Sequence, residues 1–140
     1  MDTTILAPAA VLVAWSLVML GWLAFARFGK LAKLGSKEPP APGLRGQDID
    51  PMLGTAAWKS HNYAHLMEQP TLFYATVVIL HIVQAATPLM IKFAWAYVAL
   101  RIIHSVYQAT INKVMVRFSI FMLSTICLVV LAVNAVIATL

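Results

Sequence analysis

Two histidines and a glutamate stand close together where a long apolar segment begins: His61, His65 and Glu68. A helix advances about 100° per residue, so these side chains share one face within about 60° of arc. Such a face could hold the polar groups of a ligand. Two imidazoles and a carboxylate also suit iron or zinc, but three ligands on one helix are unusual and no cysteine motif supports a zinc site. We therefore expect no metal here.

A second polar face lies on a later apolar segment and is centred on Arg101. The polar residues within about 60° of it on a helical wheel are Tyr97, His104, Ser105, Gln108 and Asn112. A carboxylate inside a membrane span is costly unless something pairs with it. We therefore predict an ion pair between Glu68 and Arg101, which could close the helix bundle, bind a ligand, or do both.

The composition is that of an integral membrane protein in one domain, residues 1–140. Hydrophobic residues make up 61% of the chain and charged residues 11%, against roughly 45–50% and 25% in soluble domains. The net charge of +5 does not indicate nucleic-acid binding, because the basic residues flank apolar runs and form no stripe with interleaved aromatics. Membrane orientation explains them better.

The apolar runs predict an all-α fold, a four-transmembrane-helix bundle. The expected helices cover about residues 3–27, 55–86, 91–112 and 117–139, with a cytoplasmic loop over 28–54. Pro70 lies inside the second helix and removes a backbone donor, so a kink is expected near Leu66.

The basic residues predict the orientation of the bundle. Eight of them fall on the side that we assign to the cytoplasm: Arg27, Lys30, Lys33, Lys37, Arg45, Lys59, Lys113 and Arg117. Only Lys92 falls on the opposite side, so both termini are expected outside the cytoplasm. Antiparallel packing would then bring the face of His61, His65 and Glu68 level with residues 101–112, with Arg117 at the mouth.

Three motifs resemble a known family: EQPTLFY at residues 68–74, RIIH at 101–104 and NKVMVR at 112–117. With four spans in about 140 residues, the chain resembles the membrane-associated proteins in eicosanoid and glutathione metabolism (MAPEG), in particular the microsomal glutathione transferases. The run HNYAHLMEQP at residues 61–70 is most similar to a bacterial branch of that family. The resemblance therefore implies a multi-pass protein of a bacterial inner membrane.

The resemblance also implies a homotrimer with glutathione sites between neighbouring subunits at the cytoplasmic side. Glu68 would hold the amino group of glutathione, Arg101 would lie at the base of the site, and Arg117 would be the catalytic residue that stabilises the thiolate. His61 and His65 stand where family members carry Arg and Asn, and an imidazole cannot bind a carboxylate bidentately. With the polar face of the third helix, the expected glutathione-binding set is His61, His65, Glu68, Arg101, His104, Gln108 and Asn112.

Three classes of function follow. The first is a glutathione-dependent transferase or peroxidase, with glutathione as cosubstrate, acting on lipophilic electrophiles that arrive through the bilayer. The second is a non-catalytic trimer of the same fold that binds lipid or serves as a scaffold. The third, which the sequence favours least, is a metal-binding membrane protein that uses His61, His65 and Glu68. The expected partners are further copies of the chain, a lipophilic small molecule and membrane lipid, without nucleic acid.

The predicted orientation can be tested with reporter fusions. Fusions at residues 40 and 114 should report the cytoplasm and fusions at either terminus the opposite side, because basic residues are retained inside. A reporter at residue 114 that is active only outside would contradict the four-helix topology.

Overall fold

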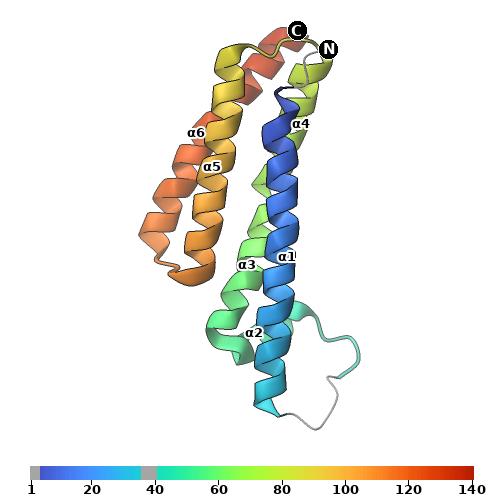
Figure 1. Cartoon of the computed structure of the whole chain (residues 1–140), viewed down its shortest axis with the longest axis vertical. Coiled ribbons are helices and arrows are strands. Elements are labelled where there is room, and N and C mark those ends of the chain that lie inside the picture. Colours follow the sequence, from blue (N-terminus) through green and yellow to red (C-terminus); the bar gives the residue numbers. More distant parts are fainter. Residues whose placement is uncertain (1–3, 36–40) are drawn as a thin grey trace.

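The computed structural model describes residues 4–35 and 41–140. All regular structure in these residues is helical (Figure 1). The elements are α1 (Leu6–Leu34), α2 (Gly46–Leu53), the 3₁₀ turn η1 (Gly54–Ala56), α3 (Ala57–Leu66), α4 (Gln69–Ile82), α5 (Pro88–Thr110) and α6 (Val114–Thr139).

The helices form an elongated bundle. α5 and α6 pack as an antiparallel pair, and α1 lies alongside α3, α4 and α5. The start of α1 and the end of α6 lie at the same end of the bundle, while α2 and the last turns of α1 extend past the α5–α6 turn at the other end (Figure 1). Among the described residues, three helices are long and apolar enough to cross a membrane: α1, α5 and α6. The chain is thus an all-helical integral membrane protein.

The helix expected over residues 55–86 is interrupted. It begins with η1, stops as α3 at Leu66 and resumes as α4 at Gln69, so the kink predicted near Leu66 is confirmed and is a complete break. Pro70 lies in the first turn of α4, where a missing N–H removes no helical bond. Between the two helices Glu68 has φ −88° and ψ −97°, outside the helical region. Neither half has the length of a membrane span, in contrast to the expectation of one continuous helix.

The expected loop over residues 28–54 is mostly helical in its described part. α1 continues to Leu34 instead of ending near residue 27, because the residues involved are good helix formers, and it stops at Gly35, whose φ of 63° is left-handed. α2 then begins after Arg45, whose backbone N–H donates to Asp48 Oδ2 at 2.8 Å. Residues 36–40 of the loop and residue 3 of the first expected helix lie outside the described residues.

The last two helices also differ slightly from expectation. α5 begins at Pro88 and ends at Thr110, against an expected range of 91–112, and α6 begins at Val114 instead of residue 117. Proline suits the first turn of a helix, and the Thr87 hydroxyl accepts a hydrogen bond from the N–H of Met90 at 3.3 Å, as an N-cap does.

Apolar side chains fill the space between the helices. Leu12 of α1, Phe73 of α4, Tyr97 of α5 and Leu131 of α6 are fully buried, and the rings of Phe73 and Tyr97 stack with their centroids 4.3 Å apart. Outward-facing apolar side chains stay exposed, as Ile137 does at 71%. An apolar outer surface of this kind is suited to contact with lipid.

A buried polar node joins three helices at the centre of this packing. The hydroxyl of Ser105 on α5 accepts hydrogen bonds from Trp15 Nε1 of α1 at 3.0 Å and from Asn62 Nδ2 of α3 at 2.7 Å. Asn62 and Ser105 are both fully buried. The node therefore fixes α3, which carries the two histidines, against α5.

Ser105→Ala should destabilise the protein, because two donors lose their acceptor and an unsatisfied buried donor costs roughly 1–3 kcal/mol. The thermal midpoint of the purified protein in detergent measures this. Ser119→Ala is the matched control, since the Ser119 hydroxyl is exposed and bonds only to the Met115 carbonyl one turn earlier. Equal midpoints for the two variants would show that the node does not hold the helices together.

Candidate functional site

One polar cavity lies between α3, α5 and the start of α6, and we call it the histidine cavity. Its volume is about 340 Å³, within the roughly 300–1,000 Å³ of small-molecule sites. The residues that line it are His61, His65, Glu68, His104, Gln108, Val114, Arg117, Phe118 and Phe121. Six of the eight predicted site residues thus share one wall within a single copy of the chain; Arg101 and Asn112 do not line it.

His65 and Glu68 face each other across the break between α3 and α4. His65 Nδ1 lies 2.9 Å from Glu68 Oε2, and the Glu68 side chain is 68% exposed. The His65 ring also lies 5.1 Å, centroid to centroid, from the ring of His104 and 5.3 Å from that of Phe121. The break thus places the Glu68 carboxylate at the entrance of the cavity. His65 lines the cavity beside the rings of His104 and Phe121.

Arg117 reaches the cavity from the first turn of α6 and is held by Asn112. Asn112 has φ 57°, a left-handed conformation that Asn tolerates better than most residues, and its N–H donates to the Tyr107 carbonyl at 2.9 Å. Its side-chain Oδ1 accepts a hydrogen bond from Arg117 Nη1 at 2.8 Å. The structure thus places Asn112 behind Arg117, where it positions the guanidinium instead of facing the cavity.

Arg101 lies behind the cavity wall and is fully buried. Its Nη2 donates to the His65 carbonyl at 3.1 Å, and its guanidinium lies 5.6 Å from the centroid of the Phe121 ring. Within the described residues, Arg101 Nε and Nη1 have no hydrogen-bond partner.

The predicted ion pair between Glu68 and Arg101 is wrong. Glu68 bonds to His65 and is largely exposed, whereas Arg101 donates to a backbone carbonyl. The helical break explains the difference, because it swings Glu68 away from α5 and leaves the His65 carbonyl without the N–H that a continuous helix would supply from Gln69.

The remaining predicted residues differ in their surroundings. Gln108 is 5% exposed, and its Oε1 is a buried acceptor without a partner within the described residues. His61 lines the cavity, but its Nε2 faces α2 and lies 3.2 Å from Asp50 Oδ2.

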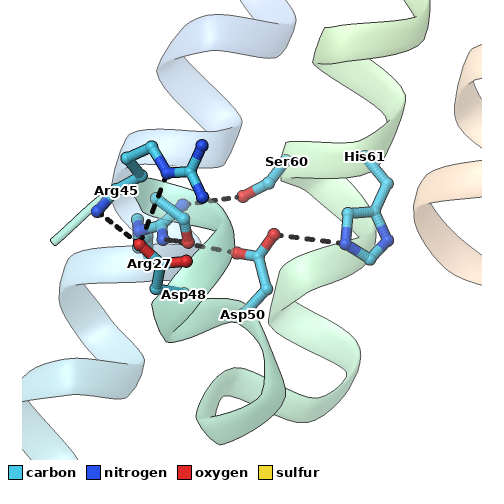
Figure 2. A network of polar contacts seen from close by, with 7 residues as sticks. Arg27, Arg45, Asp48, Asp50, Ser60 and His61 are labelled. Atoms are coloured by element: carbon cyan, nitrogen blue, oxygen red, sulfur yellow. Dashed lines mark hydrogen bonds and ion pairs between the residues drawn. The ribbon is translucent and has the colours of Figure 1, made fainter.

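The structure adds a network that the sequence analysis missed. Arg27 at the end of α1 forms an ion pair with Asp50 of α2, Nη2 to Oδ1 at 3.3 Å, and donates to the Ser60 hydroxyl at 3.1 Å and to the Gly46 carbonyl. Figure 2 shows Asp50 lying between Arg27 and His61. The sequence signal for this network was Asp50, an acidic residue close to the start of a helix. It was missed because residues 28–54 were predicted to be a loop.

No cluster of three or more His, Cys, Asp or Glu side chains in the described parts of the chain has the geometry to hold a metal ion. His61 and His65 are four residues apart, yet each pairs with a different carboxylate. The geometry thus gives the metal-binding alternative no support.

These features define a class: a helical membrane protein with a polar, arginine-edged cavity between its helices. The sequence profile of the MAPEG family matches residues 5–137, nearly the whole chain. The chain therefore belongs to the MAPEG family of membrane proteins in eicosanoid and glutathione metabolism, and the resemblance noted from its motifs is confirmed. No curated protein and no solved structure gave a match.

Glu68→Gln and Arg101→Met should couple only weakly, by about 1 kcal/mol or less, because the two side chains share His65 as a neighbour but do not contact each other. Chemical denaturation of the two single variants and the double variant in detergent measures the coupling. We expect Glu68→Gln alone to cost less than about 1 kcal/mol, as for an exposed pair. A coupling of 3 kcal/mol or more, on the order of that of a buried ion pair, would contradict the arrangement described here.

Proposed function

We propose that this protein is a glutathione-dependent membrane transferase or peroxidase that acts on lipophilic electrophiles from the histidine cavity. The observation that supports the proposal best is the convergence of Arg117, three histidines, Glu68 and Gln108 on one cavity of about 340 Å³. Membership of the MAPEG family agrees with glutathione as the ligand.

The polar groups of the cavity complement those of glutathione, which carries two carboxylates, one amino group and two amides. Glu68 has the exposed carboxylate that an amino group would pair with. His61, His65 and His104 can donate or accept hydrogen bonds according to their protonation. Gln108, whose Oε1 is buried without a partner within the described residues, would have to turn its amide toward the cavity to accept from an N–H of the peptide. Arg101 would act indirectly, by fixing the carbonyl of His65.

Arg117 is proposed to stabilise the thiolate of glutathione. Its Nη1 is engaged by Asn112, which leaves other N–H groups of the guanidinium for a ligand. A free thiol has a pKa near ~8.5, and lowering it by one unit needs about 1.4 kcal/mol of preferential stabilisation of the thiolate, within reach of one nearby positive charge.

The chemistry then follows from the nucleophile. The thiolate sulfur attacks the electrophilic atom, a C–S bond forms, and a leaving group departs with its electron pair or an adjacent π bond accepts the electrons. With a hydroperoxide, the sulfur attacks the terminal oxygen and the O–O bond breaks, giving an alcohol and a sulfenic acid. A second glutathione then condenses with the sulfenic acid to give the disulfide and water.

The lipophilic substrate is proposed to arrive through the bilayer along α6. Val114, Phe118 and Phe121 form the apolar part of the cavity wall, and Phe118 is 54% exposed. An electrophile in contact with these side chains would lie beside Arg117, one turn or less away along the same helix.

Further features of the proposal concern assembly and orientation. We propose that α3 and α4 together make a fourth membrane crossing, that the cavity opens at the cytoplasmic side of a bacterial inner membrane, and that both termini lie outside. The location of the start of α1 and the end of α6 at one end of the bundle (Figure 1) agrees with such a topology. A homotrimer would add residues of neighbouring subunits around a cavity that one chain already lines.

Glutathione should raise the thermal midpoint of the purified protein, and Arg117→Ala should retain much of the binding while losing most of the turnover of a lipophilic electrophile. The reason is that Arg117 is assigned to the thiolate, whereas His61→Ala and Glu68→Gln should weaken binding itself. Lys113→Ala is the matched control, because it removes an equal charge from an exposed side chain outside the cavity. Thermal-shift titration and steady-state kinetics supply the two readouts.

Two outcomes would contradict parts of the proposal. An absence of stabilisation by millimolar glutathione would defeat the enzyme and favour a non-catalytic lipid-binding trimer. Turnover that falls equally in Arg117→Ala and Lys113→Ala would keep the enzyme but remove the assigned role of Arg117.

A further inference from the structure

His61 differs from the other residues of the histidine cavity because a second network outside the cavity holds it. Its Nε2 faces Asp50 Oδ2 at 3.2 Å, and in Figure 2 its other ring nitrogen points away from Asp50. The side chain is 53% exposed, whereas that of Asp50 is only 12% exposed. His61 therefore lies between a nearly buried carboxylate on one side and the cavity on the other.

We propose that Asp50 is a positioning residue for His61: it holds the hydrogen of the imidazole on Nε2 and so leaves Nδ1 as an acceptor for the histidine cavity, toward an N–H donor of the ligand. The identification of that donor as an amide or amino group of glutathione rests on the function proposed above. The orientation of His61 does not, because it follows from contacts within the chain.

An ionised carboxylate can only accept hydrogen bonds, so the nitrogen that faces it, Nε2, must carry the hydrogen. Nδ1 is then the nitrogen left for the cavity, and in this tautomer its lone pair can accept a hydrogen bond but cannot donate one. The tautomer therefore suits an N–H group of the ligand and not a carboxylate.

Asp50 is also held on its other side. Its other oxygen, Oδ1, lies 3.3 Å from Arg27 Nη2 in an ion pair without hydrogen-bond geometry. Arg27 is itself fixed by the Ser60 hydroxyl on α3 and the Gly46 carbonyl on α2. Residues of α1, α2 and α3 thus jointly favour the orientation in which Oδ1 faces Arg27 and Oδ2 faces His61. A carboxylate behind a functional histidine commonly sets its tautomer and orientation in this way.

Other charged and titratable groups also face His61. From the cavity side these are His65 of α3, Glu68 of the break, His104 of α5 and Arg117 of α6; from the side of α1 it is Arg27. Among the described residues, Asp50 is the one that lies within hydrogen-bonding distance of the His61 ring, so Asp50 decides the position of the ring hydrogen.

Because Arg27 faces the other oxygen of Asp50, the variant Asp50→Asn tests directly which nitrogen of His61 carries the hydrogen. The amide oxygen of the introduced side chain will turn toward the guanidinium, because an amide nitrogen cannot accept from it. The amide NH₂ then faces His61 Nε2 and requires that nitrogen to be an acceptor. The imidazole should therefore switch to the neutral tautomer with its hydrogen on Nδ1.

Nitrogen-15 NMR of the histidine side chains in the full-length protein in detergent, without glutathione, reads this directly. We expect protonated Nε2 in the native protein, bare Nε2 in Asp50→Asn, and protonated Nε2 again in Asp50→Glu, which restores an acceptor. Asp48→Asn is the matched control on the same helix, because Asp48 contacts Arg45 and should leave the His61 signals unchanged. A His61 spectrum that is the same in the native protein and in Asp50→Asn overturns the proposal, and should the Asn variant fail to fold, an unchanged His61 spectrum in Asp50→Ala, which removes the acceptor altogether, does the same.

Affinity for glutathione provides the second readout. Asp50→Asn should weaken binding about tenfold in the native background, the effect of losing one hydrogen bond, because Nδ1 then carries a hydrogen and cannot accept from the ligand; it should have no further effect once His61→Ala is present. Equal losses in both backgrounds would overturn the positioning role. A native protein that binds no glutathione at all would reject the proposed function instead, and the NMR result alone would then support or overturn the role of Asp50.

Discussion

A cation that is completely buried between helices dominates the structure, and the break between α3 and α4 provides its acceptor. Arg101 has no exposed surface, and its hydrogen bond goes to the carbonyl of His65 in the last turn of α3. An isolated charge in such a place would be very costly. Because Pro70 favours a helix that starts anew, the His65 carbonyl at the end of α3 has only a long hydrogen bond of 3.4 Å from the Glu68 N–H, and it also accepts from the guanidinium at 3.1 Å.

The same break organises the histidine cavity. Gln69, the first residue of α4, accepts a hydrogen bond from the Tyr97 hydroxyl at 3.3 Å and donates one to Thr125 at 2.9 Å, so the break is joined to α5 and α6. Glu68 is turned outward beside His65. The proline that interrupts the expected second helix thus determines where this carboxylate lies, because the break turns Glu68 outward and onto the lining of the histidine cavity.

The helical spacing of polar residues in the sequence predicted part of this arrangement, since it shows which side chains share one face of a helix. Tyr97, Arg101 and Gln108 lie on one polar face of α5 and are buried together, and the proline located the break. The hydrogen-bond and ion-pair partners of these polar side chains were harder to predict. The acceptor for Arg101 is a backbone carbonyl, which has no signature in the sequence. Asp50 reaches His61 only because α2 folds against α3, within a segment whose prolines and glycines indicated a loop.

By the family resemblance, His61 stands where other members carry an arginine, and its contacts show what such an exchange would require. A guanidinium brings its own permanent charge and a fork of donors that binds a carboxylate bidentately. An imidazole has neither, and it can offer the cavity only one nitrogen at a time. Asp50 forms ion pairs with both Arg27 and His61, and under the proposed tautomer it is this carboxylate against Nε2 that decides which nitrogen is left for the cavity. The proposed site would then depend on α1 and α2 as well as on the helices that line the cavity, and a change in Arg27 should affect His61 through Asp50.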